Sequence, residues 1–218
     1  MTGDAVNLRI DGRKRKARQG QTILEVAREC GIEIPTLCYH EALSPIGSCR
    51  LCVVEVTQNG RTRTVASCVT PVEDGMVVRT DSEMISKIRK MVITLLLARC
   101  PTIEVIKEMA KRLGVRKSPF PKGEADCFLC GMCVRACEEI VGVGAINFAY
   151  RGPKSEVIPP FGQVSNICIG CGTCTAICPA RTFDLAKVFA RRCIHDAGRK
   201  KDIFRCPMAY GAIMSSNA

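Results

Sequence analysis

The sequence predicts an α+β protein that begins with a small mixed sheet crossed by one helix and ends in a cysteine-rich segment without regular periodicity. Three observations support this prediction. The first 80 residues carry two hairpin signals and one helix signal, the next segment has apolar residues at helical spacing, and the remainder repeats one cysteine spacing. With 218 residues and 47% hydrophobic content, the chain is expected to be globular.

Two dipeptides mark tight turns between predicted strands. Asp11-Gly12 and Asn59-Gly60 each lie between segments of strand-forming residues, and both dipeptides favour the turn type that joins antiparallel strands. Strands are therefore expected within residues 6–18 and at residues 53–57, 61–67 and 76–80.

Helix signals follow the first hairpin and the last predicted strand. Thr22 with Glu25 three residues later forms a capping box that opens a helix. Residues 83–99 repeat apolar side chains at helical spacing. Thr102 is expected to cap a further helix that Gly114 closes.

The best linker in the chain is residues 116–124, which contain two prolines and a glycine. We expect four parts, with a basic tail at the end. They are residues 1–81, a helical linker of residues 82–117, a cysteine-rich domain of residues 118–185 and a tail of residues 186–218.

The cysteine-rich domain contains the most specific signal. Two runs with the spacing Cys-x2-Cys-x2-Cys-x3-Cys occur in it, at Cys127, Cys130, Cys133 and Cys137 and at Cys168, Cys171, Cys174 and Cys178. Three thiolates at this spacing suit one face of a [4Fe-4S] cluster. Zinc also binds four thiolates, but zinc modules use paired Cys-x2-Cys knuckles rather than four cysteines in one run.

A separate set precedes these runs and has a different spacing. It consists of Cys38, Cys49, Cys52 and Cys68. A long loop, a tight Cys-x2-Cys pair and a distant fourth cysteine resemble the plant-type [2Fe-2S] pattern, although the first gap is longer here.

The residues around these cysteines resemble a known family. Segments 38–40 (CYH), 47–56 (GSCRLCVVEV) and 68–76 (CVTPVEDGM) are similar to the N-terminal iron-sulfur module of the large iron-sulfur subunit of NADH dehydrogenase. The same module occurs in the diaphorase small subunit of NAD-linked hydrogenases, in [FeFe] hydrogenases and in NAD-dependent formate dehydrogenases. The resemblance implies a β-grasp [2Fe-2S] ferredoxin domain, a helical linker and a C-terminal two-cluster [4Fe-4S] ferredoxin-like domain.

The resemblance also implies a ligand set for each cluster. In two-cluster ferredoxins the fourth cysteine of each run ligates the other cluster. By this resemblance Cys38, Cys49, Cys52 and Cys68 hold one [2Fe-2S] cluster, Cys127, Cys130, Cys133 and Cys178 hold the first [4Fe-4S] cluster, and Cys168, Cys171, Cys174 and Cys137 hold the second. Relatives usually carry a further cluster at a His-x3-Cys-x2-Cys motif, but residues 96–101 (LLARCP) have one cysteine and no histidine. Cys100 is therefore expected to be a core thiol, as is Cys30.

Three potential ligands near the C-terminus are not assigned to these sets. Cys193, His195 and Cys206 could complete an extra metal site, although three ligands fall short of a four-coordinate site and ordinary burial is the alternative. His40 is expected to be a hydrogen-bond donor near the first cluster rather than a ligand.

Charge and missing motifs narrow the function. Three clusters at about −2 each would reduce the net charge of +11 to about +5. The basic segments 13–16 (RKRK) and 199–201 (RKK) suit docking to acidic partner subunits, and ordinary solvated turns are the alternative. No dinucleotide-binding or Walker motif is present. The sequence therefore predicts a cytoplasmic electron-transfer subunit without an active site of its own or a membrane span, placed between a flavin-containing NAD(P)-binding diaphorase subunit and a hydrogenase or other redox catalytic subunit.

Two alternatives remain at this stage. The basic balance and the Cys-x2-Cys pairs also fit a zinc-stabilised nucleic-acid-binding protein, but few aromatic side chains are available to stack on bases. A catalytic subunit with an open cluster site is the second alternative, and four cysteines for every cluster argue against it.

Overall fold

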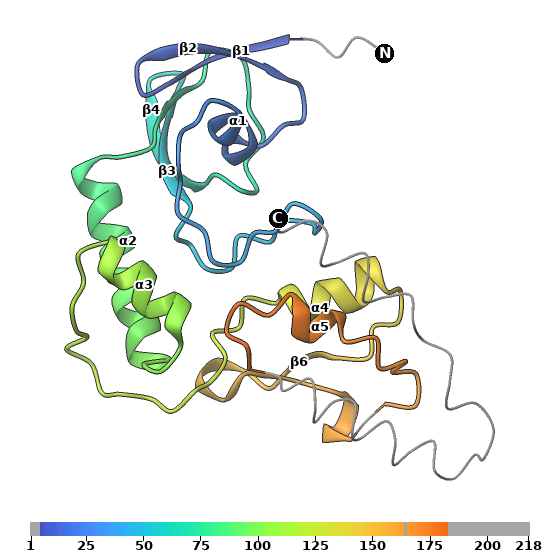
Figure 1. Cartoon of the computed structure of the whole chain (residues 1–218). Helices are drawn as coiled ribbons and strands as arrows, with labels where there is room; N and C mark the ends of the chain where they lie inside the picture. The colour runs from blue at the N-terminus through green and yellow to red at the C-terminus, as the bar shows by residue number, and fades with distance from the viewer. Residues whose placement is uncertain (1–4, 164, 183–218) are drawn as a thin grey trace. The chain divides into compact units, whose positions relative to one another are not determined.

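The computed structural model describes residues 5–163 and 165–182. The chain divides into two compact units, one of residues 1–132 and one that begins at Cys133. We describe each unit by itself (Figure 1).

The first unit is built on a five-stranded mixed sheet with the strand order β2-β1-β5-β3-β4. Its strands are β1 (Ala5–Ile10), β2 (Arg13–Arg18), β3 (Val53–Gln58), β4 (Arg61–Ala66) and β5 (Val77–Arg79). β1 pairs antiparallel with β2 and parallel with β5, while β3 pairs antiparallel with both β5 and β4. This is the predicted β-grasp arrangement.

Both predicted hairpin turns are present. Asp11 and Gly12 have φ of 48° and 79°, and Asn59 and Gly60 have φ of 50° and 73°. Positive φ at both central residues defines the turn that matches the twist of antiparallel strands, and Asn, Asp and Gly accept it at low cost. Asp11 also accepts hydrogen bonds from the backbone N–H and hydroxyl of Thr80, at 2.8 and 2.6 Å, which ties the end of β5 to the first hairpin.

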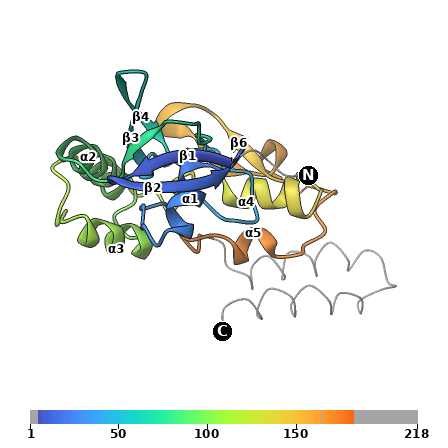
Figure 2. The ribbon, with the colours of Figure 1, turned by 90° about the horizontal axis from the view of Figure 1, so that it is seen from above.

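The helix α1 (Ile23–Glu29) packs its apolar side chains on the sheet, beneath the β1–β2 hairpin in Figure 2. The predicted capping box is formed, because the Thr22 hydroxyl accepts from the Glu25 N–H and the Glu25 carboxylate accepts from the Thr22 N–H. Alternate side chains of β1 and β3 complete this core. Its fully buried members include Ile10, Ile23, Leu24, Val54, Val56, Met76 and Val78.

Two further helices belong to the first unit. α2 (Glu83–Arg99) begins and ends at the predicted residues, and α3 (Glu104–Arg112) packs against it. The predicted cap at Thr102 is wrong, because Ile103 is the N-cap and forms no side-chain cap bond. Thr102 lies instead in the turn that the Ile103 N–H closes on the Cys100 carbonyl.

The second unit has short elements joined by irregular segments. α4 (Met132–Arg135) starts at the division between the units and continues into a π-helical turn, η1 (Ala136–Ile140). The strands β6 (Asn147–Ala149) and β7 (Glu156–Ile158) pair antiparallel, and α5 (Thr173–Ala176) packs against η1. Two 3-10 turns complete the described part, η2 (Gly152–Lys154) and η3 (Pro160–Gly162).

Candidate iron-sulfur sites

The first cysteine set gathers from three loops of the first unit. The loops follow α1, precede β3 and follow β4, and they carry Cys38, Cys49 with Cys52, and Cys68. The start of α1 anchors the third loop, because the N–H groups of Ile23 and Leu24 donate to the carbonyls of Thr70 and Ser67, both at 3.0 Å. The capping box that starts α1 therefore also positions the segment with the fourth cysteine.

The four thiols lie close together and are largely shielded from solvent. The sulfurs of Cys52 and Cys68 are 3.3 Å apart, and the Cys49 N–H lies 3.3 Å from the Cys38 sulfur. Cys38 and Cys68 are each 1% exposed and Cys52 is fully buried. The four cysteines predicted to hold the [2Fe-2S] cluster therefore lie in one compact group.

Thiol–thiol hydrogen bonds separate the acidities of these four groups. The bond from Cys38 lowers the pKa of Cys49 to about 6, and the bond from Cys68 lowers the pKa of Cys52 to about 7. The same bonds, together with burial, raise the pKa values of Cys38 and Cys68 far above the usual range of a thiol. Thiolates are the form that binds iron, and a bound metal displaces the remaining thiol protons. The donor set therefore fits an iron-sulfur cluster.

Three successive backbone carbonyls of the ligand-bearing loop are held by side chains. The Ser67 hydroxyl donates to the Cys52 carbonyl at 2.7 Å. Arg89 of α2 donates from Nε to the Leu51 carbonyl at 3.1 Å and from a terminal nitrogen to the Val53 carbonyl at 2.8 Å. The loop around Cys52 is thus held both by Ser67, which follows β4, and by Arg89 of α2.

Four cysteines of the second unit line one cavity of about 40 Å³. They are Cys137, Cys168, Cys171 and Cys174. Burial raises the pKa of the Cys174 thiol to about 11, and the other three thiols add to this shift. The Ala145 N–H donates to the Cys137 sulfur at 3.3 Å. The cavity therefore combines the last cysteine of one run with the first three of the other.

The local backbone explains how these cysteines face the cavity. Gly170 and Gly172 have φ of 63° and 76°, a conformation that residues with a Cβ rarely adopt, so the loop can wind tightly between its cysteines. Cys137 lies in the π-helical turn η1, and its carbonyl accepts from the N–H groups of Val143 and Gly144. Single π-helical turns are frequent at functional sites.

The remaining predicted set is divided between the two units. Cys127 and Cys130 belong to the first unit, while Cys133 and Cys178 belong to the second. Leu129 has a left-handed φ of 58°, and its N–H lies 3.4 Å from the Cys127 sulfur. The gathering of these four cysteines around one cluster stays a prediction from their spacing.

Two cysteine-bearing loops of the first unit meet directly. The Ser48 hydroxyl lies 3.5 Å from the Leu129 carbonyl. Ser48 precedes Cys49, whereas Leu129 precedes Cys130. The loop that carries Cys49 therefore lies against the loop that carries Cys127 and Cys130.

Comparisons with known proteins match both cysteine-bearing parts of the chain. A model of a 2Fe-2S iron-sulfur cluster binding domain matches residues 3–83, and a model of a 4Fe-4S dicluster domain matches residues 126–182. The NADP-reducing hydrogenase subunit HndD of Solidesulfovibrio fructosivorans is 34% identical over 206 residues, which are 80% of this chain and 35% of that protein. The 75 kDa subunit of the NADH-ubiquinone oxidoreductase of Reclinomonas americana is 31% identical over 199 residues, 80% of this chain and 28% of that protein. The chain therefore combines a 2Fe-2S domain with a 4Fe-4S dicluster domain, and it shares this iron-sulfur module with the two relatives.

A solved structure supports the fold of the module. A chain in the crystal structure of an NAD+-reducing [NiFe]-hydrogenase in the H2-reduced state matches with a TM-score of 0.70 and 29% identity, over 80% of this chain and 84% of that chain. The module spans 35% or less of the two curated relatives named above. These matches favour iron over zinc, and they lend no support to the nucleic-acid alternative.

Sequence reasoning missed several residues that shape the module's sites. Arg89 and Ser67 were not singled out, although Arg89 lies on the same helical face as Ile85 and Ile93. A charged residue in a buried helical stripe is a signal that could have found it. The Nδ1 of His40 accepts a hydrogen bond from the Ala42 N–H at 3.2 Å, which leaves Nε2 as the donor nitrogen, and the donor role near the first cluster stays a prediction.

Of the four cysteines outside the predicted ligand sets, Cys30 and Cys100 lie in the described residues. Cys100 is fully buried, as expected, and Cys30 is half-buried against the core. The possible extra site of Cys193, His195 and Cys206 lies outside the described residues. Within residues 5–163 and 165–182, no group of three or more ligands is arranged to hold a single metal ion, and no helix could span a membrane.

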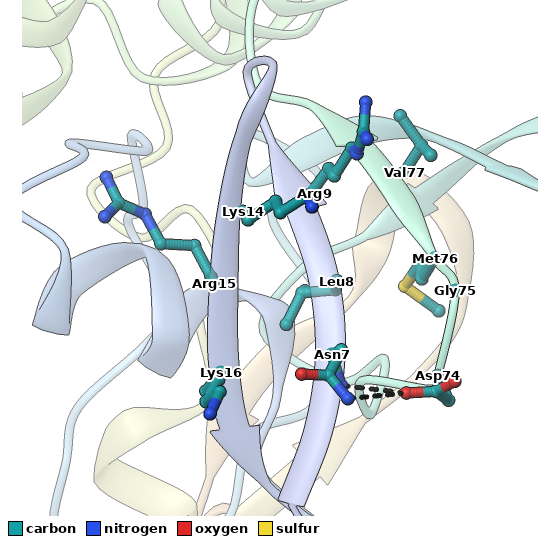
Figure 3. A pocket seen from close by; sticks show the side chains of 10 residues that line it. All are labelled: Asn7, Leu8, Arg9, Lys14, Arg15, Lys16, Asp74, Gly75, Met76 and Val77. Atoms are coloured by element: carbon teal, nitrogen blue, oxygen red, sulfur yellow. Dashed lines mark hydrogen bonds between the residues drawn. The ribbon is translucent and has the colours of Figure 1, made fainter.

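A basic groove of about 490 Å³ is lined by both strands of the β1–β2 hairpin and by residues 74–77, and no cysteine lines it (Figure 3). Arg9 pairs with Lys14 across the hairpin, and Lys16 pairs with Asn7. The single carboxylate that lines the groove, Asp74, is hydrogen-bonded to Asn7 at 2.9 Å. Four basic side chains line the groove, and in the described part of the chain none of them forms an ion pair; they are Arg9, Lys14, Arg15 and Lys16.

Proposed function

We propose that this module carries single electrons through one [2Fe-2S] and two [4Fe-4S] clusters, between a flavin-containing NAD(P)-binding diaphorase subunit and a hydrogenase or other redox catalytic subunit. The proposed ligands are the three sets of four cysteines defined above. When bound, each cluster accepts and releases one electron at a time. The assignment of the two [4Fe-4S] sets follows the exchange of the fourth cysteine between the repeats.

The observation that carries this proposal is the contact between two ligand-bearing loops in the first unit. The Ser48 hydroxyl and the Leu129 carbonyl meet at 3.5 Å, and each lies one residue from a proposed ligand. Electron transfer requires cofactors that are close together, so adjacent ligand loops suit a relay. A pair of isolated structural zinc sites would not require this adjacency.

The cavity of the second unit supports the same proposal. A set drawn from two runs joins the beginning and the end of the [4Fe-4S] domain around a single cluster. Cys137 and the first three cysteines of the second run line one cavity, which is the combination that this arrangement requires.

The residues of the chain contribute shielding and hydrogen bonds to sulfur. The sulfurs of Cys38, Cys127 and Cys137 each have a backbone N–H within 3.4 Å, from Cys49, Leu129 and Ala145 in turn. Amide hydrogen bonds and burial are the two protein contributions that tune cluster potentials. The described residues can therefore hold clusters in a partly buried environment with hydrogen bonds to sulfur.

The basic groove is the surface we propose for docking an acidic subunit. Arg9, Lys14 and Lys16 lack acidic partners in the described residues, so an acidic surface would pair them with little rearrangement. The groove is lined by none of the cysteines, which assigns it to assembly rather than to electron entry.

The metal content tests the proposed function directly. Protein purified without oxygen should contain about ten irons and about ten sulfides per chain, the sum of the three clusters. Reduction with dithionite should produce a [2Fe-2S] EPR signal and faster-relaxing [4Fe-4S] signals. About four zinc ions per chain and no EPR signal after reduction would contradict the proposal.

Charge reversal tests the docking surface in the native complex. The tagged double variant Lys14→Glu/Lys16→Glu should release the co-purifying flavin subunit at lower salt than the unmodified chain, because paired surface charges are screened by salt. The matched control is Lys90→Glu/Lys122→Glu, which changes the net charge equally on exposed residues outside the groove. Equal release by both variants would reject the groove as the docking surface.

A further inference from the structure

Arg89 is a buried cation in the middle of α2. Its side chain is 7% exposed, and its helical neighbours Ile85 and Ile93 are fully buried. A buried charge costs several kcal/mol unless other groups compensate it. A neutral side chain with two donors could bond backbone carbonyls without that cost. The buried guanidinium of Arg89 therefore requires a compensating anion nearby.

Two hydrogen bonds aim the guanidinium at the ligand-bearing loop. Its donors reach the carbonyls of Leu51 and Val53, the residues on either side of Cys52. The Cys52 carbonyl between them is bonded by Ser67. The positive charge of Arg89 is thereby held against the backbone on both sides of a proposed ligand, Cys52.

No carboxylate in the described residues forms an ion pair with Arg89. Burial lowers the pKa of Arg89, whereas the charges of Asp81, Cys52 and Asp11 oppose this shift. An arginine remains protonated at neutral pH even so. Asp81 is the strongest of these charges, and it accepts a hydrogen bond from the Ser86 hydroxyl at 3.3 Å, while Asp11 accepts from Thr80. Neither carboxylate is within ion-pair distance of the guanidinium, so the thiolate set is a further counter-charge for it.

We propose that Arg89 is a positioning residue whose buried charge raises the reduction potential of the [2Fe-2S] centre. This inference rests on the proposed ligand set of Cys38, Cys49, Cys52 and Cys68. Reduction adds one electron and one negative charge to a site that is already anionic, and no proton is needed. A fixed positive charge in a low-dielectric environment stabilises the reduced form more than the oxidised form.

The proposal predicts different effects from two substitutions with similar hydrogen-bonding capacity. Arg89→Gln removes the charge but retains two donors for the loop carbonyls, while Arg89→Lys retains the charge and loses the forked geometry. The assay is a redox titration followed by the [2Fe-2S] EPR signal. At a fixed ambient potential, the ratio of reduced to oxidised centre should be about tenfold lower in the Gln variant than in the unmodified protein. For one electron this equals a lower potential by about 59 mV. The Lys variant should have the same [2Fe-2S] reduction potential as the unmodified protein.

A second arginine of α2 provides the matched control. Arg99 donates to the Cys127 carbonyl at 3.4 Å, in the loop that begins the other cysteine set. Arg99→Gln also removes one positive charge from α2, but at a carbonyl beside a different proposed cluster. It should therefore leave the [2Fe-2S] reduction potential unchanged. An equal shift in Arg99→Gln would refute a local effect of Arg89.

The remaining outcomes separate this inference from the proposed function. Absence of a [2Fe-2S] signal in the unmodified protein would reject the ligand assignment itself. A normal signal with equal potentials in the Gln and Lys variants would reject only the role of Arg89. If the Gln variant loses the signal, a Lys variant that keeps the signal and the potential supports the charge. Loss of the signal in both variants would assign Arg89 to loop structure alone and overturn the inference.

Discussion

The pairing of cysteines with the two [4Fe-4S] clusters can be tested by removing one cluster and then one further cysteine. Replacing both Cys168 and Cys171 with Ala removes two ligands of the same set, so the second [4Fe-4S] cluster should be lost. The iron content should fall from about ten to about six per chain, since four irons leave with one such cluster. Using two substitutions avoids a three-iron remnant that a single missing ligand could leave.

The fourth cysteines then distinguish the crossed arrangement from an uncrossed one. Cys137 lines the cavity of the lost cluster, so adding Cys137→Ala to this background should leave about six irons unchanged. Adding Cys178→Ala instead should damage the remaining [4Fe-4S] cluster and lower the iron content toward about two. Iron analysis and low-temperature EPR of anaerobic protein measure both results.

Each of these variants carries its own control for folding. The [2Fe-2S] signal should persist in all of them, because Cys38, Cys49, Cys52 and Cys68 lie in the first unit. The reverse pattern, with further iron loss from Cys137→Ala and none from Cys178→Ala, would refute the crossed assignment. It would mean that each run of four cysteines holds its own cluster.

Three further predictions concern Cys100, Ser67 and Gly123 of the first unit. Burial raises the pKa of Cys100 to about 11, so at pH 8 only about one thiol in a thousand is ionised; peptide mass spectrometry after native alkylation should find half-buried Cys30 labelled and Cys100 unlabelled. Ser67→Ala removes the hydroxyl bond to the ligand loop and should lower the free energy of unfolding by about 1–2 kcal/mol in chemical denaturation. Gly123→Ala should cost about 1–3 kcal/mol in the same assay, because its Cβ would lie 2.8 Å from the Arg99 carbonyl oxygen.

Matched variants show what would contradict these three predictions. Rapid labelling of Cys100 at pH 8 would mean that its thiol is ionised or accessible. Ser48→Ala removes an exposed hydroxyl with a 3.5 Å contact and should change stability by less than about 0.5 kcal/mol; an equal loss in both serine variants would contradict the role of Ser67. Lys122→Ala, next to Gly123 but exposed, should be near neutral, so equal costs at the two positions would contradict the steric argument.

The Cys100 prediction also has a direction in pH. A pKa raised in the folded state means that the folded protein prefers the neutral thiol. Its contribution to stability is fully present below the unfolded pKa of about 8.5 and is lost as the pH rises toward about 11. A denaturation series across this range should show a steeper fall for the unmodified chain than for Cys100→Ala.

Local turn and cap chemistry accounts for the elements that could be predicted. Asp11-Gly12, Asn59-Gly60 and the Thr22 capping box act through neighbouring residues, so the sequence contains all the information they need. The expected strand 61–67 ends one residue early because Ser67 leaves the ladder and donates to the Cys52 carbonyl. That partner is 15 residues away in the sequence, and no local pattern identifies it.

The cysteine spacings by themselves indicated the kind of cofactor, because cluster geometry restricts which thiolates a short loop can present. The tertiary structure decided which loops meet. It placed Cys137 with the second run, brought Ser48 against Leu129, and positioned Arg89 behind the Cys52 loop. These contacts join residues 30 or more positions apart, and they depend on packing between elements rather than on any periodicity that the sequence displays.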